Sequence, residues 1–310
     1  MRVLELTFKE AVEICKALSS EQRMQIMEFI SAGPLNVNDI SERMGIPFST
    51  TVFNVKKLEE AGLISPTIVP GRGSQKISSI KYNQIIINLF KPELNNQDTL
   101  IYEMPIGEFV DCKVEPSCGL VNENGHLGTQ NDPRSFYEPN RREAQHLFLS
   151  GNGFVEYRYP NRLPKGSIPE ELEFSAELCS EAPHYQLDWP SDITLWINHV
   201  EIGTWTSQGD FGGKRGFLTP EWVPINSSQY GLLKYWSIND QGTFIDGVRI
   251  SDVTIDQLNL LQIPFISVKI GIKDDAVHSG GLNLFGKKFG NYDQDLILKV
   301  LYSNESKSVV

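Results

Sequence analysis

The sequence predicts an α+β protein of two domains: a small helical domain that ends in a β-hairpin, followed by a mainly antiparallel, jelly-roll-like β-sandwich. The chain has 310 residues, more than one domain usually contains. Before residue 62 apolar residues recur at helical spacing, whereas from residue 148 onward they alternate with polar ones, as in half-buried strands. No long helical period interrupts these strands, which favours a sandwich over an α/β fold.

The composition is that of an ordinary globular protein, with 40% hydrophobic and 22% charged residues. No apolar run approaches the roughly 18–20 residues of a membrane span. Acidic residues near the N-terminus stand where a signal peptide needs its apolar stretch. The four cysteines, Cys15, Cys112, Cys118 and Cys179, are widely spaced, which fits a reducing compartment. We therefore expect a soluble, cytoplasmic protein.

The net charge of −11 is distributed unevenly along the chain. Residues 1–90 hold ten Lys or Arg and nine Asp or Glu, so the other 220 residues have 18 basic and 30 acidic side chains, a net charge of −12. Such a charge argues against nucleic acid wrapping around the whole molecule. It predicts that the two parts of the chain meet different partners.

Four short helices are predicted in the first domain, over residues 7–18, 20–31, 36–44 and 49–61. Ser19 or Ser20 can cap the second helix and Asn36 or Asn38 the third, while Ser49 opens the fourth. The residues expected to face inward are Ala11, Val12, Cys15, Leu18, Met24, Met27, Ile30, Ile40, Met44, Val52, Val55, Leu58 and Ala61.

The third and fourth helices have the helix-turn-helix pattern. They are joined by a turn that contains Gly45, and the second of them is apolar on one side and carries Ser, Thr, Asn and Lys on the other. The next segment, LISPTIVPGRGSQKISSIKY, predicts two strands around a basic, glycine-rich tip at residues 70–74, which is typical of a wing. A plain helical bundle with a hairpin is the alternative. The order of the elements favours a winged helix-turn-helix that binds DNA.

Residues 12–82 resemble the winged-helix domain of ArsR-type bacterial repressors. LSSEQRMQIMEFI is similar to that family's "dptRl.IL..L" segment, and VNDISERMGIPFSTTVFNVKKLEEAGLI is similar to its "eLa..lglsqstvS.HLk.LeeaGLv". The resemblance implies a recognition helix whose DNA-facing positions are Ser49, Thr50, Thr51, Phe53, Asn54 and Lys57, with Arg72 at the wing tip.

Two departures from that family limit what can be carried over. Its metal sensors have a Cys-x-Cys pair on the third helix, where this chain has Asp39-Ile40-Ser41-Glu42, so metal sensing by that route is excluded. The usual His of the recognition helix is replaced by Phe53 or Asn54, so the family's base preference does not transfer.

Two kinds of contact with double-stranded DNA are expected, to phosphates and to base edges. Lys56, Lys57, Arg72 and Lys76 are expected at phosphates, and Ser49, Thr50, Thr51 and Asn54 at base edges. The complete candidate set is Ser49, Thr50, Thr51, Phe53, Asn54, Lys56, Lys57, Arg72, Ser74 and Lys76. We expect a homodimer, because such domains read paired half-sites of an operator.

The predicted domain boundaries give three segments. Residues 1–92 form the winged helix-turn-helix, residues 93–147 a linker and irregular segment that packs on the second domain, and residues 148–310 the β-sandwich. Strands are expected at about residues 153–159, 172–179, 193–206, 230–237, 243–250, 266–272 and 296–302. The segment ITLWINHVEIGTW resembles a hairpin of carbohydrate-binding jelly rolls, with a turn at Asn198-His199.

Neither a metal site nor a catalytic site is predicted. Cys112, Cys118 and His126 lie within 15 residues, but their spacing lacks the short ligand pairs of structural zinc sites and a fourth ligand. We expect buried cysteines and no cofactor. No zincin, nucleophile-elbow or dinucleotide-binding motif occurs.

A concentration of aromatic and polar residues suggests a ligand site in the β-domain. All five tryptophans lie within 48 residues, and those at positions 196 and 236 are expected in the core. Trp205 and Trp222 are candidates for an aromatic platform that suits sugar rings. The complete set of candidate ligand-binding residues is Tyr157, Arg158, Asn161, Trp205, Asp210, Arg215 and Trp222.

These observations predict a DNA-binding transcriptional regulator, a repressor, that works as a homodimer and has no enzymatic activity. Its β-domain would sense a small molecule, with a neutral saccharide favoured over an amine. Two alternatives stay open. In one, the β-domain is a protein–protein assembly module without a ligand. In the other, the protein is a carbohydrate-active enzyme with an accessory winged helix.

Overall fold

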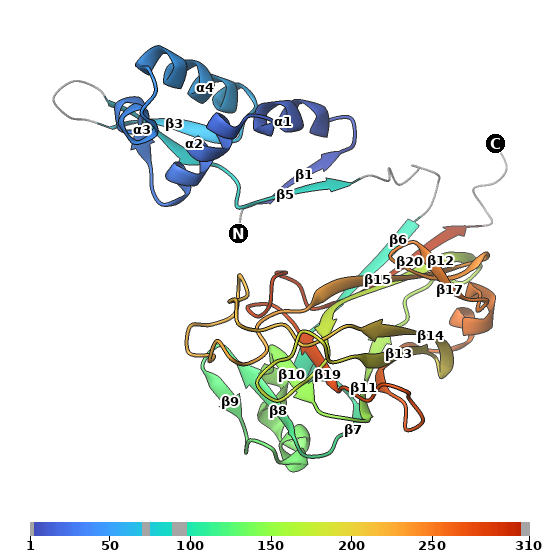
Figure 1. Cartoon of the computed structure of the whole chain (residues 1–310). Helices are drawn as coiled ribbons and strands as arrows, with labels where there is room; N and C mark the ends of the chain where they lie inside the picture. Colours follow the sequence, from blue (N-terminus) through green and yellow to red (C-terminus); the bar gives the residue numbers. More distant parts are fainter. Residues whose placement is uncertain (1–2, 70–74, 89–97, 305–310) are drawn as a thin grey trace. The chain divides into compact units, whose positions relative to one another are not determined.

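The computed structural model describes residues 3–69, 75–88 and 98–304. The chain divides into two compact units, Met1–Leu94 and Asn95–Val310, and each is described by itself (Figure 1). The wing tip expected at residues 70–74, with Arg72 and Ser74, lies outside the described residues.

The N-terminal unit is a winged helix-turn-helix with an added pair of parallel strands. Strands β2, β4 and β3 form an antiparallel sheet in that order, and β1 pairs in parallel with β5. The helices pack around fully buried Ile26, Ile40 and Leu58. In chain order the elements are β1 (Val3–Thr7), α1 (Ala11–Leu18), α2 (Glu21–Ser31), β2 (Leu35–Asn36), α3 (Val37–Met44), α4 (Phe48–Glu60), β3 (Ile64–Val69), β4 (Gln75–Ile80) and β5 (Gln84–Asn88).

The ends of α3 follow the signals in the sequence. The Asn36 side chain accepts a hydrogen bond from the Asp39 N–H at 2.9 Å and so caps the first turn. Gly45 follows the helix in the left-handed region, with φ of 64°, which lets the chain turn sharply towards α4. Helix α4 begins at Phe48, one residue before the expected Ser49.

Four residues expected to face inward, Val12, Cys15, Met24 and Val52, are exposed. In α2, the buried residues are Ile26 and Ile30. Met24 precedes Ile26 by two residues, and since each residue turns a helix by about 100°, it lies on the opposite side. Periodicity therefore predicted the four helices and several of their buried residues, such as Ile40 and Leu58, but it misplaced these exposed ones.

The C-terminal unit is an antiparallel β-sandwich, as the alternating pattern predicts. One sheet runs β17-β16-β15-β12-β19-β10-β8-β9, with β20 joining β12 to β6, and the other runs β14-β13-β18-β11-β7. The strands are β6 (Asp98–Met104), β7 (Asp111–Lys113), β8 (Cys118–Asn122), β9 (Gly125–Leu127), β10 (His146–Leu149), β11 (Gly153–Pro160), β12 (Ser167–Cys179), β13 (Ser191–Ile197), β14 (Val200–Ser207), β15 (Leu232–Asn239), β16 (Gly242–Ile245), β17 (Val248–Ser251), β18 (Phe265–Ile272), β19 (Leu282–Phe285) and β20 (Leu296–Asn304).

Strand β12 organises the larger sheet. It pairs with β15 along one edge and with β20 and then β19 along the other. Leu172, Phe174, Ala176 and Leu178 alternate along it, and all four are buried in a core to which both sheets contribute. Trp236 is also fully buried in this core, as expected.

Residues 98–127, expected to be a linker and irregular segment, contain four strands of the sandwich. Strand β6 pairs with β20, β7 with β11, and β8 with both β10 and β9. The sequence does not reveal them because β7 and β9 have three residues each, while all five residues of β8 are buried and so show no alternation.

Among the described residues, no helix is long and apolar enough to cross a membrane. All four cysteines are free thiols; Cys112, Cys118 and Cys179 are buried and Cys15 is exposed.

Candidate functional site

The first candidate site is the outward face of α4, the second helix of the helix-turn-helix. Ser49, Phe53, Lys56 and Lys57 are exposed along this face, and Thr50 is half-buried beside it. Phe53 has 59% of its surface exposed, although a phenylalanine is usually buried. Residues spaced by three and four share one side of a helix, so these side chains form one stripe.

Thr51 and Asn54 do not belong to this stripe, which corrects the expectation that they face base edges. Thr51 is fully buried, and its hydroxyl donates to the Pro47 carbonyl at 3.3 Å. Asn54 is 4% exposed, and its Nδ2 donates to Gln22 Oε1 and to the Thr50 carbonyl, both at 3.1 Å. Asn54 therefore fastens α4 to α2.

The lysines near the stripe all have acidic neighbours. The Lys57 ammonium lies 2.8 Å from the Glu60 carboxylate, and that of Lys56 lies 3.9 Å from it. Lys76 on β4 pairs with Glu59 at 2.7 Å. The two pairs with Glu60 are exposed and contribute little to stability, so the Lys56 and Lys57 ammonium groups can exchange Glu60 for phosphates at small cost. The Glu59 side chain is only 16% exposed, so its pair with Lys76 is the more protected one.

Val52 is the part of this face that sequence reasoning missed. It was assigned to the core, yet it is exposed beside Phe53. The spacing of Ser49, Val52 and Lys56 is itself a helical repeat, and counting outward from Ser49 would have found it.

In the β-domain, Tyr157, Arg158 and Asn161 have structural surroundings, which corrects their expected grouping as a ligand site. Tyr157 is fully buried, and its hydroxyl donates to the Ile106 carbonyl at 2.8 Å. Asn161 Nδ2 donates to the Ile263 carbonyl at 3.0 Å. The Arg158 guanidinium lies 4.6 Å from the centre of the Phe265 ring.

Arg215 and Trp205 also have partners of their own. The Arg215 guanidinium donates to the carbonyls of Pro220 and Val223, at 2.7 and 3.3 Å, and so holds the loop that carries Trp222. Trp205 packs against the core with the Lys234 ammonium 4.9 Å above its ring. Neither residue is among those that line the pocket described next, which contains Trp222.

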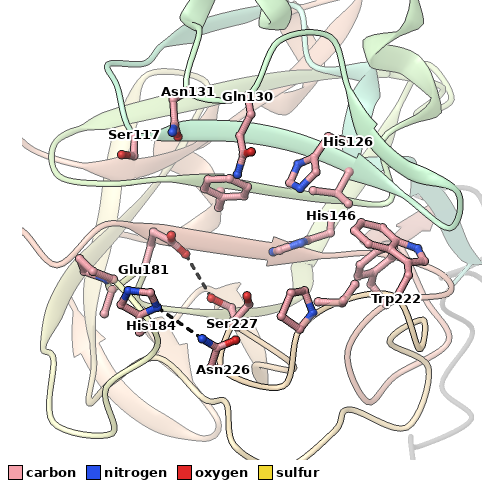
Figure 2. A pocket seen from close by; sticks show the side chains of 18 residues that line it. Ser117, His126, Gln130, Asn131, His146, Glu181, His184, Trp222, Asn226 and Ser227 are labelled. Carbon is pink, nitrogen blue, oxygen red and sulfur yellow. Dashed lines mark hydrogen bonds between the residues drawn. The ribbon is translucent and has the colours of Figure 1, made fainter.

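Trp222 does line a pocket, with a volume of about 480 Å³. Figure 2 shows Ser117, His126, Gln130 and Asn131 along one side of this pocket and Glu181, His184, Asn226 and Ser227 along the other. The Trp222 indole N–H donates to the Glu123 carbonyl at 2.7 Å, and His126 meets the indole edge-on at 5.8 Å between ring centres. This volume is within the range of roughly 300–1,000 Å³ for small-molecule sites.

A chain of hydrogen bonds lies beneath the pocket. His146 Nε2 and Asn283 Oδ1 are 2.8 Å apart, and Asn283 Nδ2 donates to Glu181 Oε2 at 2.7 Å. The Ser228 hydroxyl donates to Asp210 Oδ2 at 2.8 Å and lies 3.2 Å from Glu181 Oε2. Asp210, expected at a ligand, is fully buried and supports the pocket from behind.

Burial shifts the pKa values of these groups. It raises the pKa of Glu181 to about 8, helped by the nearby Asp210 carboxylate, and raises that of Asp210 to about 6. Burial also lowers the pKa of His146 to about 4. At neutral pH Asp210 is therefore ionised, His146 is neutral and Glu181 is mostly protonated.

Cys112, Cys118 and His126 do not come together as metal ligands. Cys112 is on β7 and Cys118 on β8, both buried, while His126 on β9 lies against Trp222. Within the residues that the structure describes, no three His, Cys, Asp or Glu side chains are grouped so that they could hold a metal ion.

The fold of the N-terminal unit and the exposed face of α4 define a winged helix-turn-helix domain. Residues 18–67 match the family of proteins described as a helix-turn-helix domain. No curated protein matches the chain.

Solved structures resemble each unit. A homodimeric winged helix-turn-helix domain from Mycobacterium bovis, described as a possible ArsR-family regulator, is 24% identical over 23% of this chain and 64% of its own, with a TM-score of 0.21. Reduced HlyU from Vibrio cholerae is 21% identical over 24% of this chain and 76% of its own, with a TM-score of 0.22. The CBM36-1 domain of a multidomain xylanase from the hindgut metagenome of Trinervitermes trinervoides is 12% identical over 66% of this chain and 96% of its own, with a TM-score of 0.26. All three TM-scores are below 0.5, so these likenesses carry no argument about function.

Proposed function

We propose that this chain is a DNA-binding transcriptional regulator of the cytoplasm, a repressor that acts as a homodimer. The observation that carries this proposal is the exposed stripe on α4, in a domain that matches the helix-turn-helix family. Such domains place the second helix of the motif in the major groove.

The proposed contacts follow the exposure of each side chain. Ser49 and Thr50 lie near the start of α4, where base edges are reached, and exposed Phe53 and Val52 suit the methyl group of thymine. The proposed phosphate contacts come from the basic side chains and the wing, namely Lys56, Lys57, Lys76, Arg72 and Ser74.

A homodimer is supported by an apolar surface around α1. Phe8 is 66% and Val12 46% exposed, and they line one groove with Cys15 and Ile87 of β5. We assign this surface to a second copy of the chain, because paired half-sites require two recognition helices held at a fixed spacing.

The β-domain is proposed to sense a small molecule through the pocket at Trp222. No Lys or Arg lines that pocket, and residues 91–310 carry a net charge of −12, so a neutral or cationic effector is favoured over an anion. The effector would change the spacing of the two recognition helices within the dimer. We propose that the pocket binds this effector without a catalytic step.

The test measures binding of the full chain to duplexes selected from its own promoter region, by fluorescence anisotropy at several salt concentrations. Lys57→Ala should weaken binding to all sequences alike and reduce the salt slope by about one. Lys165→Ala, at an exposed lysine of the β-domain, is the matched control and should bind as the wild type does. Binding without salt dependence, or no binding, would refute the proposal.

A further inference from the structure

The pocket in the β-domain has an unusual charge balance. Of the described residues that line it, Glu181 is the only one with a carboxylate and none is a Lys or Arg. Among the described residues, no Lys or Arg forms an ion pair with Glu181 or with Asp210 behind it. Two acidic groups thus share a buried region without a basic partner, which is costly unless one is protonated or a cation is bound.

The polar contacts of Glu181 keep its carboxyl at the pocket wall. Asn283 Nδ2 and the Ser228 hydroxyl both contact Oε2, at 2.7 and 3.2 Å. Both partners are themselves held, because Asn283 contacts His146 and Ser228 donates to Asp210. The Glu181 carboxyl is therefore positioned before any ligand arrives, which lowers the entropic cost of binding.

Much of the remaining wall is aromatic or apolar. Trp222, Phe148 and Phe289 line the pocket together with Pro183 and Pro224. Because the Trp222 N–H is already bonded to the Glu123 carbonyl, the indole contributes to the site as a ring of fixed orientation. Aromatic rings attract cations through their negative faces, most strongly where water is excluded.

We propose that this pocket binds a small organic cation that carries an ammonium group, with the Glu181 carboxylate as its counter-ion; Trp222 closes the opposite end of the same pocket (Figure 2). The proposal rests on the proposed function in one respect only, that the β-domain senses a small molecule. It names the chemical class of that molecule, and it replaces the saccharide that the tryptophan pattern favours.

Binding of a cation and binding of a neutral ligand should differ in whether Glu181 loses its proton. The groups that face Glu181 are Asp210, Ser228 and Asn283, with Cys179 and His146 behind them and His184 on the same wall. Glu181 has a pKa of about 8 and the Asp210 beside it about 6, both raised mainly by burial. An ammonium ion therefore binds as the Glu181 proton leaves for solvent, whereas a neutral sugar has no need to displace it.

The experiment is titration calorimetry of the full chain with choline, tetramethylammonium and n-butylamine as ammonium probes. The neutral control is 3,3-dimethylbutan-1-ol, which has choline's shape with carbon in place of nitrogen. At least one ammonium probe should bind saturably in the millimolar range or better, and the neutral isostere should bind at least tenfold more weakly. For choline, whose charge does not change with pH, affinity should rise about tenfold between about pH 7 and 9 as Glu181 loses its proton.

Matched variants separate a binding role from a structural one. Glu181→Gln keeps an oxygen for Asn283 and should reduce affinity for the cation at least tenfold at pH 9, while Glu221→Gln, at an exposed glutamate of the neighbouring loop, should not. If Glu181→Gln fails to fold, the comparison of choline with its neutral isostere on the unchanged chain remains as the readout.

Three results would overturn the inference: no saturable binding of any ammonium probe, equal binding of the neutral isostere, or stronger binding of glucose or xylose than of every cation. Failure of the proposed function looks different. In that case the cation binds with the expected pH dependence, but the full chain does not bind DNA in a salt-dependent way, or its affinity for DNA is the same with and without the cation.

Discussion

The structure gives Asn54 a role that one substitution can test. Replacing Asn54 with Ala removes the two hydrogen bonds from Nδ2, to Gln22 Oε1 and to the Thr50 carbonyl, at a site that is 4% exposed. Each such bond contributes about 1 kcal/mol net, so we expect Asn54→Ala to lower the free energy of unfolding of the N-terminal unit by about 1–3 kcal/mol, including some lost packing.

Circular dichroism in the helical band can follow this unit within the full chain, because all α-helices of the described residues lie in it. Phe53→Ala is the matched comparison one residue away. Phe53 is 59% exposed, so its removal should change stability by less than about 0.5 kcal/mol, while it weakens DNA binding. At temperatures where both variants are folded, Asn54→Ala should keep the base preference of the wild type.

The opposite pattern would refute the reasoning. If Asn54→Ala is as stable as the wild type and changes which bases are preferred, the amide reaches DNA and the buried contact to α2 is not its role.

Three further outcomes are expected. Glu60→Gln should strengthen binding to all DNA sequences, because it removes a negative charge beside Lys56 and Lys57; unchanged affinity in anisotropy titrations would contradict this. Val12→Asp should shift the protein from dimer to monomer in sedimentation experiments, whereas Val248→Asp, at a more exposed site of β17, should not. For Glu181, burial raises the folded-state pKa from 4.5 to about 8, so the folded protein binds the extra proton and its stability falls as pH rises through that interval. Glu181→Gln should therefore flatten the decline of unfolding free energy between about pH 5 and 8, followed by tryptophan fluorescence; identical slopes would argue against a buried, protonated Glu181.

Local signals in the sequence account for most of the secondary structure. The cap at Asn36 and the turn at Gly45 define α3, and the alternation from Leu172 to Leu178 defines β12, because these features depend on neighbours along the chain. The turn at Asn198-His199 was also predicted correctly, because a turn depends on neighbouring residues as well. Asn198 and His199 both have positive φ, which a two-residue hairpin turn needs, although His199 stands where glycine is usual.

The direction of individual side chains and the residues of the pocket could not be predicted from neighbours along the chain. Thr51 and Asn54 are polar, so their place on the inner side of α4 depends on partners such as Gln22, which is 32 residues from Asn54 in sequence. The pocket joins five separate segments, around residues 117–131, 146–148, 181–184, 222–228 and 289. Only the fold brings these segments together, so Trp222 was found by its residue type while Glu181 was not.

The parallel pairing of β1 with β5 brings the first and the last described strands of the N-terminal unit together in one two-stranded sheet. Five residue pairs, from Val3–Gln84 to Thr7–Asn88, are in register. Because Ile87 of β5 lines the groove beside α1, any change in this pairing would reshape the surface that we assign to the second copy of the chain.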